Sequence, residues 1–255
     1  MLELQNLSKH FGGVRAVDSL NLRIEPGQIF GLIGPNGSGK STTVNLITGL
    51  LNVTSGSIRL SGEEITRLPT HVRLSSGIAR TFQNIRLFGQ LTVWQNLWVA
   101  ENSRAQRERT SFLSRWLGGE SGARARITKA LEFSGLADKA NELAANLAFG
   151  EQRRLELARA MAAEPKLLLL DEPAAGMNAE EIGALDERIR QIRDSGITVL
   201  LIEHHMELIM AIADRIAVLN FGQKIAEGTP AEVQANPAVR EAYLGTAETA
   251  TRGTA

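Results

Sequence analysis

Alternating apolar and polar positions mark the beginning of the chain as β-structure. Leu20, Leu22 and Ile24 are separated by polar residues, which gives the period of two of a half-buried strand. The uninterrupted apolar run at residues 29–33 is typical of a strand buried on both faces. Glycine turns predict one more short strand within residues 55–62. We therefore expect strands and turns over the first 33 residues, followed by a further strand.

Apolar residues three or four positions apart predict amphipathic helices further along the chain. Pro165 and Gly196 each follow such a pattern and mark helix ends. Thr92 stands where a capping residue is expected, and Thr229-Pro230 begins a capping-box sequence. The helical patterns are formed by Val44, Ile47 and Leu51; Val93, Leu97 and Ala100; Leu155, Ala158 and Ala162; Ile182, Leu185, Ile189 and Ile192; and Ile209 with Ala213.

The middle of the chain differs from its two ends. Residues 84–150 read as mostly helical, whereas buried strands are predicted again at Leu167–Leu170 and Ile197–Ile202. Strands that alternate with helices favour an α/β fold. Glutamates interleave the Arg-rich segment 104–126, so we interpret it as a loose, solvated insertion. Residues 246–255 are small and polar and are expected to be frayed.

Composition narrows the classes of function. The 255 residues carry 28 basic and 28 acidic side chains, and only 5% are aromatic, which disfavours nucleic acid as a partner. Cysteine is absent, so disulfides and thiol nucleophiles are excluded. No apolar stretch approaches the roughly 18 residues of a membrane span, and the N-terminus lacks the organisation of a signal peptide. We expect a soluble cytoplasmic protein, without direct lipid insertion, that acts at a membrane only through partners.

A phosphate-binding loop is predicted at residues 34–42, GPNGSGKST. The segment matches G-x-x-x-x-G-K-[ST], in which glycines let backbone N–H groups surround phosphate oxygens. Lys40 is expected to reach the β- and γ-phosphates, and the Ser41 hydroxyl to bind Mg²⁺. A chance glycine-rich turn is the alternative, but a strand is predicted before the loop and a helix after it. The predicted binding residues are Gly34, Pro35, Asn36, Gly37, Ser38, Gly39, Lys40, Ser41 and Thr42.

Two acidic residues, Asp171 and Glu172, follow the apolar run at residues 167–170. Ligands of parallel sheets bind at the carboxyl ends of the strands, where this pair is predicted to lie. Asp171 suits a magnesium ion at the phosphate site, and Glu172 suits a base that orients or deprotonates an attacking water. In isolation, the pair is better explained as ordinary carboxylates at a strand end. The complete phosphate loop favours the catalytic interpretation.

Five motifs resemble, in this order, those of the ATP-binding cassette (ABC) ATPases: GPNGSGKST, a lone Gln83, LAFGEQRRLELARAM, LLLLDEP and His204. The resemblance covers essentially residues 2–245 and implies ATP hydrolysis with ATP and Mg²⁺ as cofactors. It implies an α/β fold of the P-loop NTPase class and ABC type. Such a fold has a mixed or parallel core sheet, an N-terminal antiparallel β-subdomain and a helical subdomain. The expected division is a nucleotide-binding core at 1–83 and 151–245, a helical subdomain at 84–150 and a tail at 246–255.

The resemblance also implies roles for individual residues. Phe11 corresponds to the aromatic that stacks on adenine, with Ala16 beside it. Gln83 corresponds to the glutamine that contacts Mg²⁺ and water and senses the membrane partner. His204 corresponds to the switch histidine at the γ-phosphate. The signature segment, which binds the ATP of the opposite subunit, is represented by Ala148, Gly150 and Glu151.

Taken singly, these residues have plainer explanations, such as a core aromatic for Phe11. The signature also departs from the usual family pattern, because Ala148 and Phe149 replace Ser and Gly, and Glu151 replaces Gln. Ala148 cannot donate a hydroxyl hydrogen bond to phosphate. Asn178 replaces the usual Asp of the interface loop. An ABC-like binding module without turnover is therefore an alternative.

A narrower resemblance is to an ATPase subunit of branched-chain amino acid importers. It implies a second ABC ATPase subunit (identical or paralogous), two integral membrane permease subunits and, indirectly, an extracytoplasmic solute-binding protein. It also implies peripheral attachment to the cytoplasmic face of the inner membrane. Alternatives are a soluble ABC ATPase of an assembly system, or one for urea and amide uptake or lipopolysaccharide export. The segments that carry this resemblance are 79–100, 172–178, 201–210 and 225–237.

Overall fold

The computed structural model describes residues 1–107, 120–204 and 206–243. The chain divides into two compact units, one formed by Met1–Ser76 with Leu169–Ala255 and the other by Gly77–Leu168. The tail expected at residues 246–255 lies outside the described residues.

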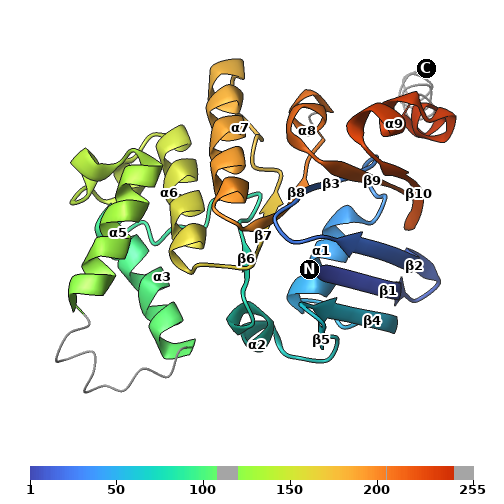
Figure 1. The fold of residues 1–255 in the computed structure, drawn as a ribbon, viewed down its shortest axis with the longest axis horizontal. Coiled ribbons are helices and arrows are strands. Elements are labelled where there is room, and N and C mark those ends of the chain that lie inside the picture. Colours follow the sequence, from blue (N-terminus) through green and yellow to red (C-terminus); the bar gives the residue numbers. More distant parts are fainter. Residues whose placement is uncertain (108–119, 205, 244–255) are drawn as a thin grey trace. The chain divides into compact units, whose positions relative to one another are not determined.

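The first unit begins with an antiparallel sheet in the order β2-β1-β4-β5 (Figure 1). Its first strand runs antiparallel to both of its neighbours. The predicted alternation is confirmed, because Leu20, Leu22 and Ile24 are buried and the residues between them are exposed. The strands are β1 (Leu2–Phe11), β2 (Val14–Ile24), β4 (Ser55–Leu60) and β5 (Glu63–Glu64).

A mixed sheet with the order β10-β9-β3-β8-β7 forms the core of the first unit. Its central strand β3 runs parallel to β8 and β9, whereas β10 is antiparallel to β9. Every residue of β3 and β8 is buried, as was predicted for the apolar run at 29–33 and for the strand at Ile197–Ile202. The two sheets confirm the expected fold class. The strands are β3 (Ile29–Ile33), β7 (Leu167–Asp171, in this unit from Leu169), β8 (Thr198–Ile202), β9 (Arg215–Asn220) and β10 (Gln223–Gly228).

Five helices of the described chain belong to this unit: α1 (Lys40–Thr48), α2 (Thr70–Ser75), α7 (Ala179–Asp194), α8 (Met206–Ile212) and α9 (Pro230–Ala235). The capping box at Thr229 is confirmed, because its hydroxyl accepts the Glu232 N–H. The prediction that Leu51 continues the first helix was wrong. That helix ends at Gly49, whose φ of 77° is left-handed and stops the helical hydrogen bonding.

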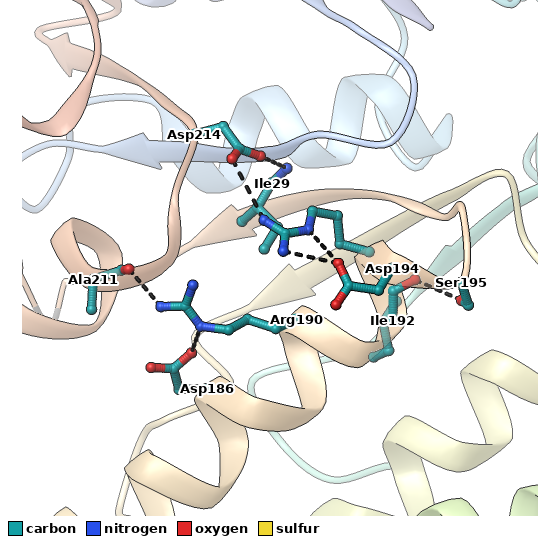
Figure 2. A network of polar contacts seen from close by, with 9 residues as sticks. Ile29, Asp186, Arg190, Ile192, Asp194, Ser195, Ala211 and Asp214 are labelled. Carbon is teal, nitrogen blue, oxygen red and sulfur yellow. Dashed lines mark hydrogen bonds and ion pairs between the residues drawn. The ribbon is translucent and has the colours of Figure 1, made fainter.

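Charged side chains fasten the end of α7 to the start of β3 (Figure 2). Arg193 pairs with Asp194 and with Asp214, and the Asp214 carboxylate accepts the N–H of Ile29 at 2.7 Å. One turn earlier, Arg190 pairs with its own helix and donates to the carbonyl of Ala211. The contact of Asp214 with Ile29 lies at the amino end of β3 and positions the strand there, away from its carboxyl end.

The second unit is mostly helical and has its own apolar core. Val93, Leu97, Ile127 and Leu155 meet in that core. Thr92 caps α3 as predicted, because its hydroxyl accepts the Gln95 N–H. The elements are β6 (Ile78–Arg80), α3 (Val93–Arg107), α5 (Glu120–Ser134), α6 (Phe149–Ala162) and the short 3₁₀ turns η2 (Ala137–Lys139) and η3 (Ala144–Asn146).

The Arg-rich segment 104–126 is not loose at its two ends. Its first residues continue α3 to Arg107, and α5 begins at Glu120; residues 108–119 lie outside the described part. Within the described ranges, no helix combines the length and the apolar character needed to cross a bilayer.

Candidate functional site

Glycine backbone conformations shape the loop that follows β3. Gly37 and Gly39 have φ values of 78° and 103°, a region that residues with a side chain rarely adopt. A Cβ on Gly39 would lie 2.4 Å from the carbonyl oxygen of Ala16, and a Cβ on Gly34 would lie 2.1 Å from that of Leu219. The loop therefore packs directly against neighbouring backbone, and only glycine fits at both positions.

The N-terminus of α1 is open to an anion. In this fully described helix, Gly39 supplies no side-chain cap and no acidic residue lies in the first turn. The N–H groups of the first turn and the positive end of the helix dipole are thus left for an external acceptor. The buried hydroxyl of Ser38 also has no hydrogen-bond partner among the described residues. These groups fit a bound phosphate.

Lys40 is folded over the same loop. Its Nζ donates to the carbonyl oxygens of Gly34 at 2.7 Å and Pro35 at 3.0 Å. Burial lowers the pKa of Lys40, and the charges of Glu172 and Asp171 raise it in part. The two carboxylates therefore lie close enough to act on the ammonium group, and the acidic pair and the phosphate loop share one site.

The acidic pair stands at the carboxyl end of the sheet. Asp171 is the last residue of β7 and is buried. Glu172 has a φ of 49°, and its N–H donates to the carbonyl of Ile202, the last residue of β8, at 2.8 Å. This left-handed turn lets the chain leave β7 abruptly while the strand ends stay joined.

His204 lies beside this pair. Its Nδ1 is 3.8 Å from Glu172 Oε2 and equally 3.8 Å from Glu203 Oε2. Glu203, which no sequence motif singled out, is fully buried and accepts the N–H groups of Ala174 at 2.8 Å and of His204 at 3.1 Å. Glu203 thus ties the loop after Glu172 to the loop that carries His204. Its position directly after the predicted strand Ile197–Ile202 was the available signal.

Phe11 lies on the surface of the first unit with 46% of its area exposed, so the explanation as a core aromatic is wrong. Lys9 Nζ lies 4.9 Å from the centre of its ring. The carbonyl of Ala16 abuts Gly39, which places β2 directly against the phosphate loop. Tyr243, also missed by the sequence analysis, contacts the backbone of Gly34. Burial raises the pKa of its hydroxyl to about 12.

Two predicted groups, Gln83 and the signature segment, belong to the second unit. Gln83 is exposed, and its carbonyl oxygen accepts a hydrogen bond from Arg153. At the start of α6, the Glu151 carboxylate accepts the Ala148 N–H at 3.1 Å and pairs with Lys139 at 2.8 Å. The hydrogen bond from Lys139 holds the pKa of Glu151 below its usual range. The carboxylate of Glu151 therefore already has partners within its own unit.

The oxygen donors of the first unit suit Mg²⁺. Within the described part of the chain, no cluster of three His, Cys, Asp or Glu side chains could hold a metal. Mg²⁺ commonly needs only one or two carboxylates together with substrate phosphates. Asp171 and the Ser41 hydroxyl offer such donors, so the residues present fit the ion.

The mixed sheet, the glycine loop and the acidic pair opposite Lys40 together define a P-loop nucleotide-binding protein. A family model described as "ABC transporter" matches residues 17–175. A second, "Branched-chain amino acid ATP-binding cassette transporter", matches residues 223–249. The chain belongs to the ABC transporter ATPases, which bind and hydrolyse ATP.

Individual relatives extend over almost the whole chain. The high-affinity branched-chain amino acid transport ATP-binding protein BraF of Pseudomonas aeruginosa is 44% identical, over 97% of this chain and 98% of its own length. LivG of Escherichia coli K12, which bears the same description, is 45% identical over the same shares. The structure of the ADP conformation of MJ1267, an ATP-binding cassette of an ABC transporter, superposes with a TM-score of 0.83 at 30% identity. It covers 96% of this chain and 98% of its own.

Proposed function

We propose that this chain hydrolyses ATP to drive the uptake of branched-chain amino acids through a membrane transporter. The observation that carries the proposal is the 44–45% identity with BraF and LivG over nearly the full length of all three chains. Identity confined to the nucleotide-binding loops would support only an ATPase. Here the C-terminal match at residues 223–249, away from those loops in sequence, supports the particular transport class.

In this proposal the first unit supplies the cis half of the ATP site. The backbone N–H groups of residues 34–42 and the ammonium of Lys40 hold the phosphates, and Phe11 stacks on adenine beside Ala16. Ser41 and Asp171 would hold Mg²⁺, which supplies charge neutralisation at the phosphates when bound. Gln83, from the second unit, would be a further ligand of the ion.

Glu172 orients or deprotonates the attacking water. Its carboxylate lies 3.8 Å from His204 Nδ1, and about half of the His204 side chain is exposed, so a phosphate can approach its imidazole.

The second unit supplies the trans half and the contact with the membrane. A second ABC ATPase subunit, identical or paralogous, packs head to tail, so that its Ala148, Gly150 and Glu151 approach the ATP held by this chain. Two integral membrane permease subunits dock near Gln83, and an extracytoplasmic solute-binding protein delivers the amino acid. The chain itself attaches peripherally at the cytoplasmic face of the inner membrane.

The test uses Glu172→Gln in the complete transporter, reconstituted in vesicles with ATP on the side of the membrane that carries the ATPase subunits. A positioned base contributes about 10²- to 10⁴-fold, so we expect kcat for ATP to fall by that factor while ATP still binds. Uptake of labelled leucine should stop in parallel. Glu187→Gln, a matched change on the exposed side of α7, should leave both unchanged.

Two results would count against the proposal. Wild-type turnover in Glu172→Gln would remove the role of that carboxylate. Uptake of labelled urea, but not of leucine, isoleucine or valine, by the wild-type transporter would refute the substrate class while leaving the ATPase intact.

A further inference from the structure

The segment between β6 and α3 contains Gln83, and side chains of α6 form hydrogen bonds with its backbone. Both terminal nitrogens of Arg153 donate to this segment, Nη1 to the carbonyl of Phe82 at 3.0 Å and Nη2 to the carbonyl of Gln83. A planar guanidinium suits two neighbouring acceptors of this kind, because its donors form a rigid fork. All of these residues belong to the second unit.

Glu156 holds the same segment one turn further along α6. Its Oε1 accepts the N–H of Arg86 at 3.2 Å, and a backbone hydrogen bond with Phe82 adds to this. Glu156 Oε2 also lies 3.4 Å from Arg153 Nη1. Two side chains of α6 therefore bind the backbone of residues 82–86: Arg153 donates to its carbonyls, and Glu156 accepts from its N–H groups.

The Arg153–Glu156 pair is buried, with only 8% and 3% of each residue exposed. Burying both charges is costly, and apolar residues of similar size often stabilise a protein as well or better. A gain in the stability of the folded chain therefore does not explain well why an ion pair is buried here. A need to fix the backbone around Gln83 gives a better one, since apolar side chains could not bind its carbonyl and amide groups.

The first turn of α6 completes the arrangement. The ring centre of Phe149 lies 5.4 Å from the guanidinium of Arg153, within range of a cation–π contact. Phe149 is one of the residues by which the signature departs from the usual family pattern, in which glycine has no ring to offer. On the other side, the guanidinium of Arg86 lies 4.4 Å from the ring of Phe82.

We propose that Arg153 and Glu156 are positioning residues that fix the Gln83 segment to the first turns of α6, with Phe149 covering Arg153. This proposal rests on the proposed function, in which Gln83 acts at the ATP site and the start of α6 acts on the ATP of the opposite subunit. The two groups then move as one body within the second unit. A change at either is passed to the other through Arg153.

The experiment compares Arg153→Met with wild type in the assembled transporter. Displacing an active-site group by about 1 Å can cost about 100-fold, so we expect kcat for ATP to fall by about 10- to 100-fold. ATP affinity and KM should stay unchanged, because Lys40 and the glycine loop belong to the first unit. Hydrogen exchange should accelerate at the amides of Phe82 and Arg86. Arg124→Met, on the exposed face of α5, is the matched control and should change none of these quantities.

Arg153→Lys gives an independent measurement should the methionine variant fail to fold. Lysine keeps the positive charge beside Glu156, but a single ammonium lacks the fork of donors that serves two carbonyls. The kcat of Arg153→Lys should therefore lie between that of wild type and that of Arg153→Met. Wild-type kcat in both variants, or in the one that folds, would overturn the proposal. Faster exchange at residues 82–86 without any loss of kcat would overturn it as well. A wild-type transporter without ATPase activity would refute the proposed function instead. The hydrogen-exchange comparison would then still test whether Arg153 holds the backbone of residues 82–86.

Discussion

Two helix N-termini that were both expected to meet ATP are built in opposite ways. In α1, which is fully described, Gly39 offers no capping side chain and the first turn holds no acid. In α6, Ala148 offers none either, but the Glu151 carboxylate turns back to accept the Ala148 N–H at 3.1 Å. This is half of a capping box, in which the residue inside the helix supplies the only side-chain acceptor.

The difference teaches which of the two ends can bind an anion unaided. A carboxylate in the first turn interacts favourably with the helix dipole, and here it also accepts the N–H of Ala148, which directly precedes the helix. The start of α6 therefore already holds a negative charge, which Lys139 offsets at 2.8 Å. The start of α1 has a positive side chain instead, Lys40, and its N–H groups remain for phosphate. We infer that α1 provides the primary affinity for ATP.

The largest expected effect comes from adding a side chain to the glycine loop that precedes α1. A methyl group on Gly39 would meet the Ala16 carbonyl at 2.4 Å in a left-handed conformation. Strain and overpacking together should lower the free energy of unfolding of Gly39→Ala by about 2–5 kcal/mol. Gly37→Ala is the matched control, because its φ is also positive but no atom lies within 4 Å of the added carbon. It should lose only about 1–2 kcal/mol.

Chemical denaturation of both variants measures this difference directly. Equal losses would mean that the loop can move away from β2, and that the close packing against Ala16 does not define its shape.

The next effect concerns charge at α1. Lys40→Met removes the ammonium that lies over the loop, and charge-assisted hydrogen bonds contribute about 1.5–3 kcal/mol. The Kd for ATP should therefore rise by about 10- to 150-fold, as measured by titration of the isolated chain. Lys129→Met, on the exposed face of α5, provides the control and should bind like wild type. An unchanged Kd for Lys40→Met would place the affinity elsewhere.

Local patterns predicted the α1 end of this comparison well. The buried run of β3, the glycine loop and the following helix are contiguous in sequence, so periodicity and turn chemistry were sufficient. The position of Asp171 and Glu172 at the sheet edge followed from the rule that parallel strands end at one edge of a sheet. The end of α1 was missed because Leu51 fits the helical spacing, yet the left-handed Gly49 stops the helix before it.

Contacts between residues far apart in sequence could not be predicted. Arg73 is buried, and its guanidinium donates to backbone carbonyls, those of Leu46 and Ile47 at the end of α1 and that of Leu68. A lone arginine in a short helix reads as a surface residue. The pairing of Lys139 with Glu151 likewise depends on how η2 meets α6, which no local pattern encodes.

The smallest expected effect tests the α6 end through pH. Glu151→Gln keeps an acceptor for the Ala148 N–H but removes the ion pair with Lys139, so Tm at neutral pH should fall only slightly. The pKa of Glu151 is lowered from 4.5 in the folded chain. The stabilisation is therefore complete above 4.5 and is lost as the pH falls through the lower folded value. The Tm difference between wild type and variant should stay constant from neutral pH to about 4.5 and shrink below it.

Scanning calorimetry across this range decides the point. A difference that persists in acid would show that the carboxylate acts by shape rather than by charge. The same variant also sharpens the comparison of the two helices. Because α1 supplies the primary affinity, the Kd for ATP of the isolated chain should not change when Glu151 loses its charge. A clear change in that Kd would show that the start of α6 reaches the nucleotide of its own chain, and the contrast between an open and a self-neutralised helix end would no longer explain where ATP binds.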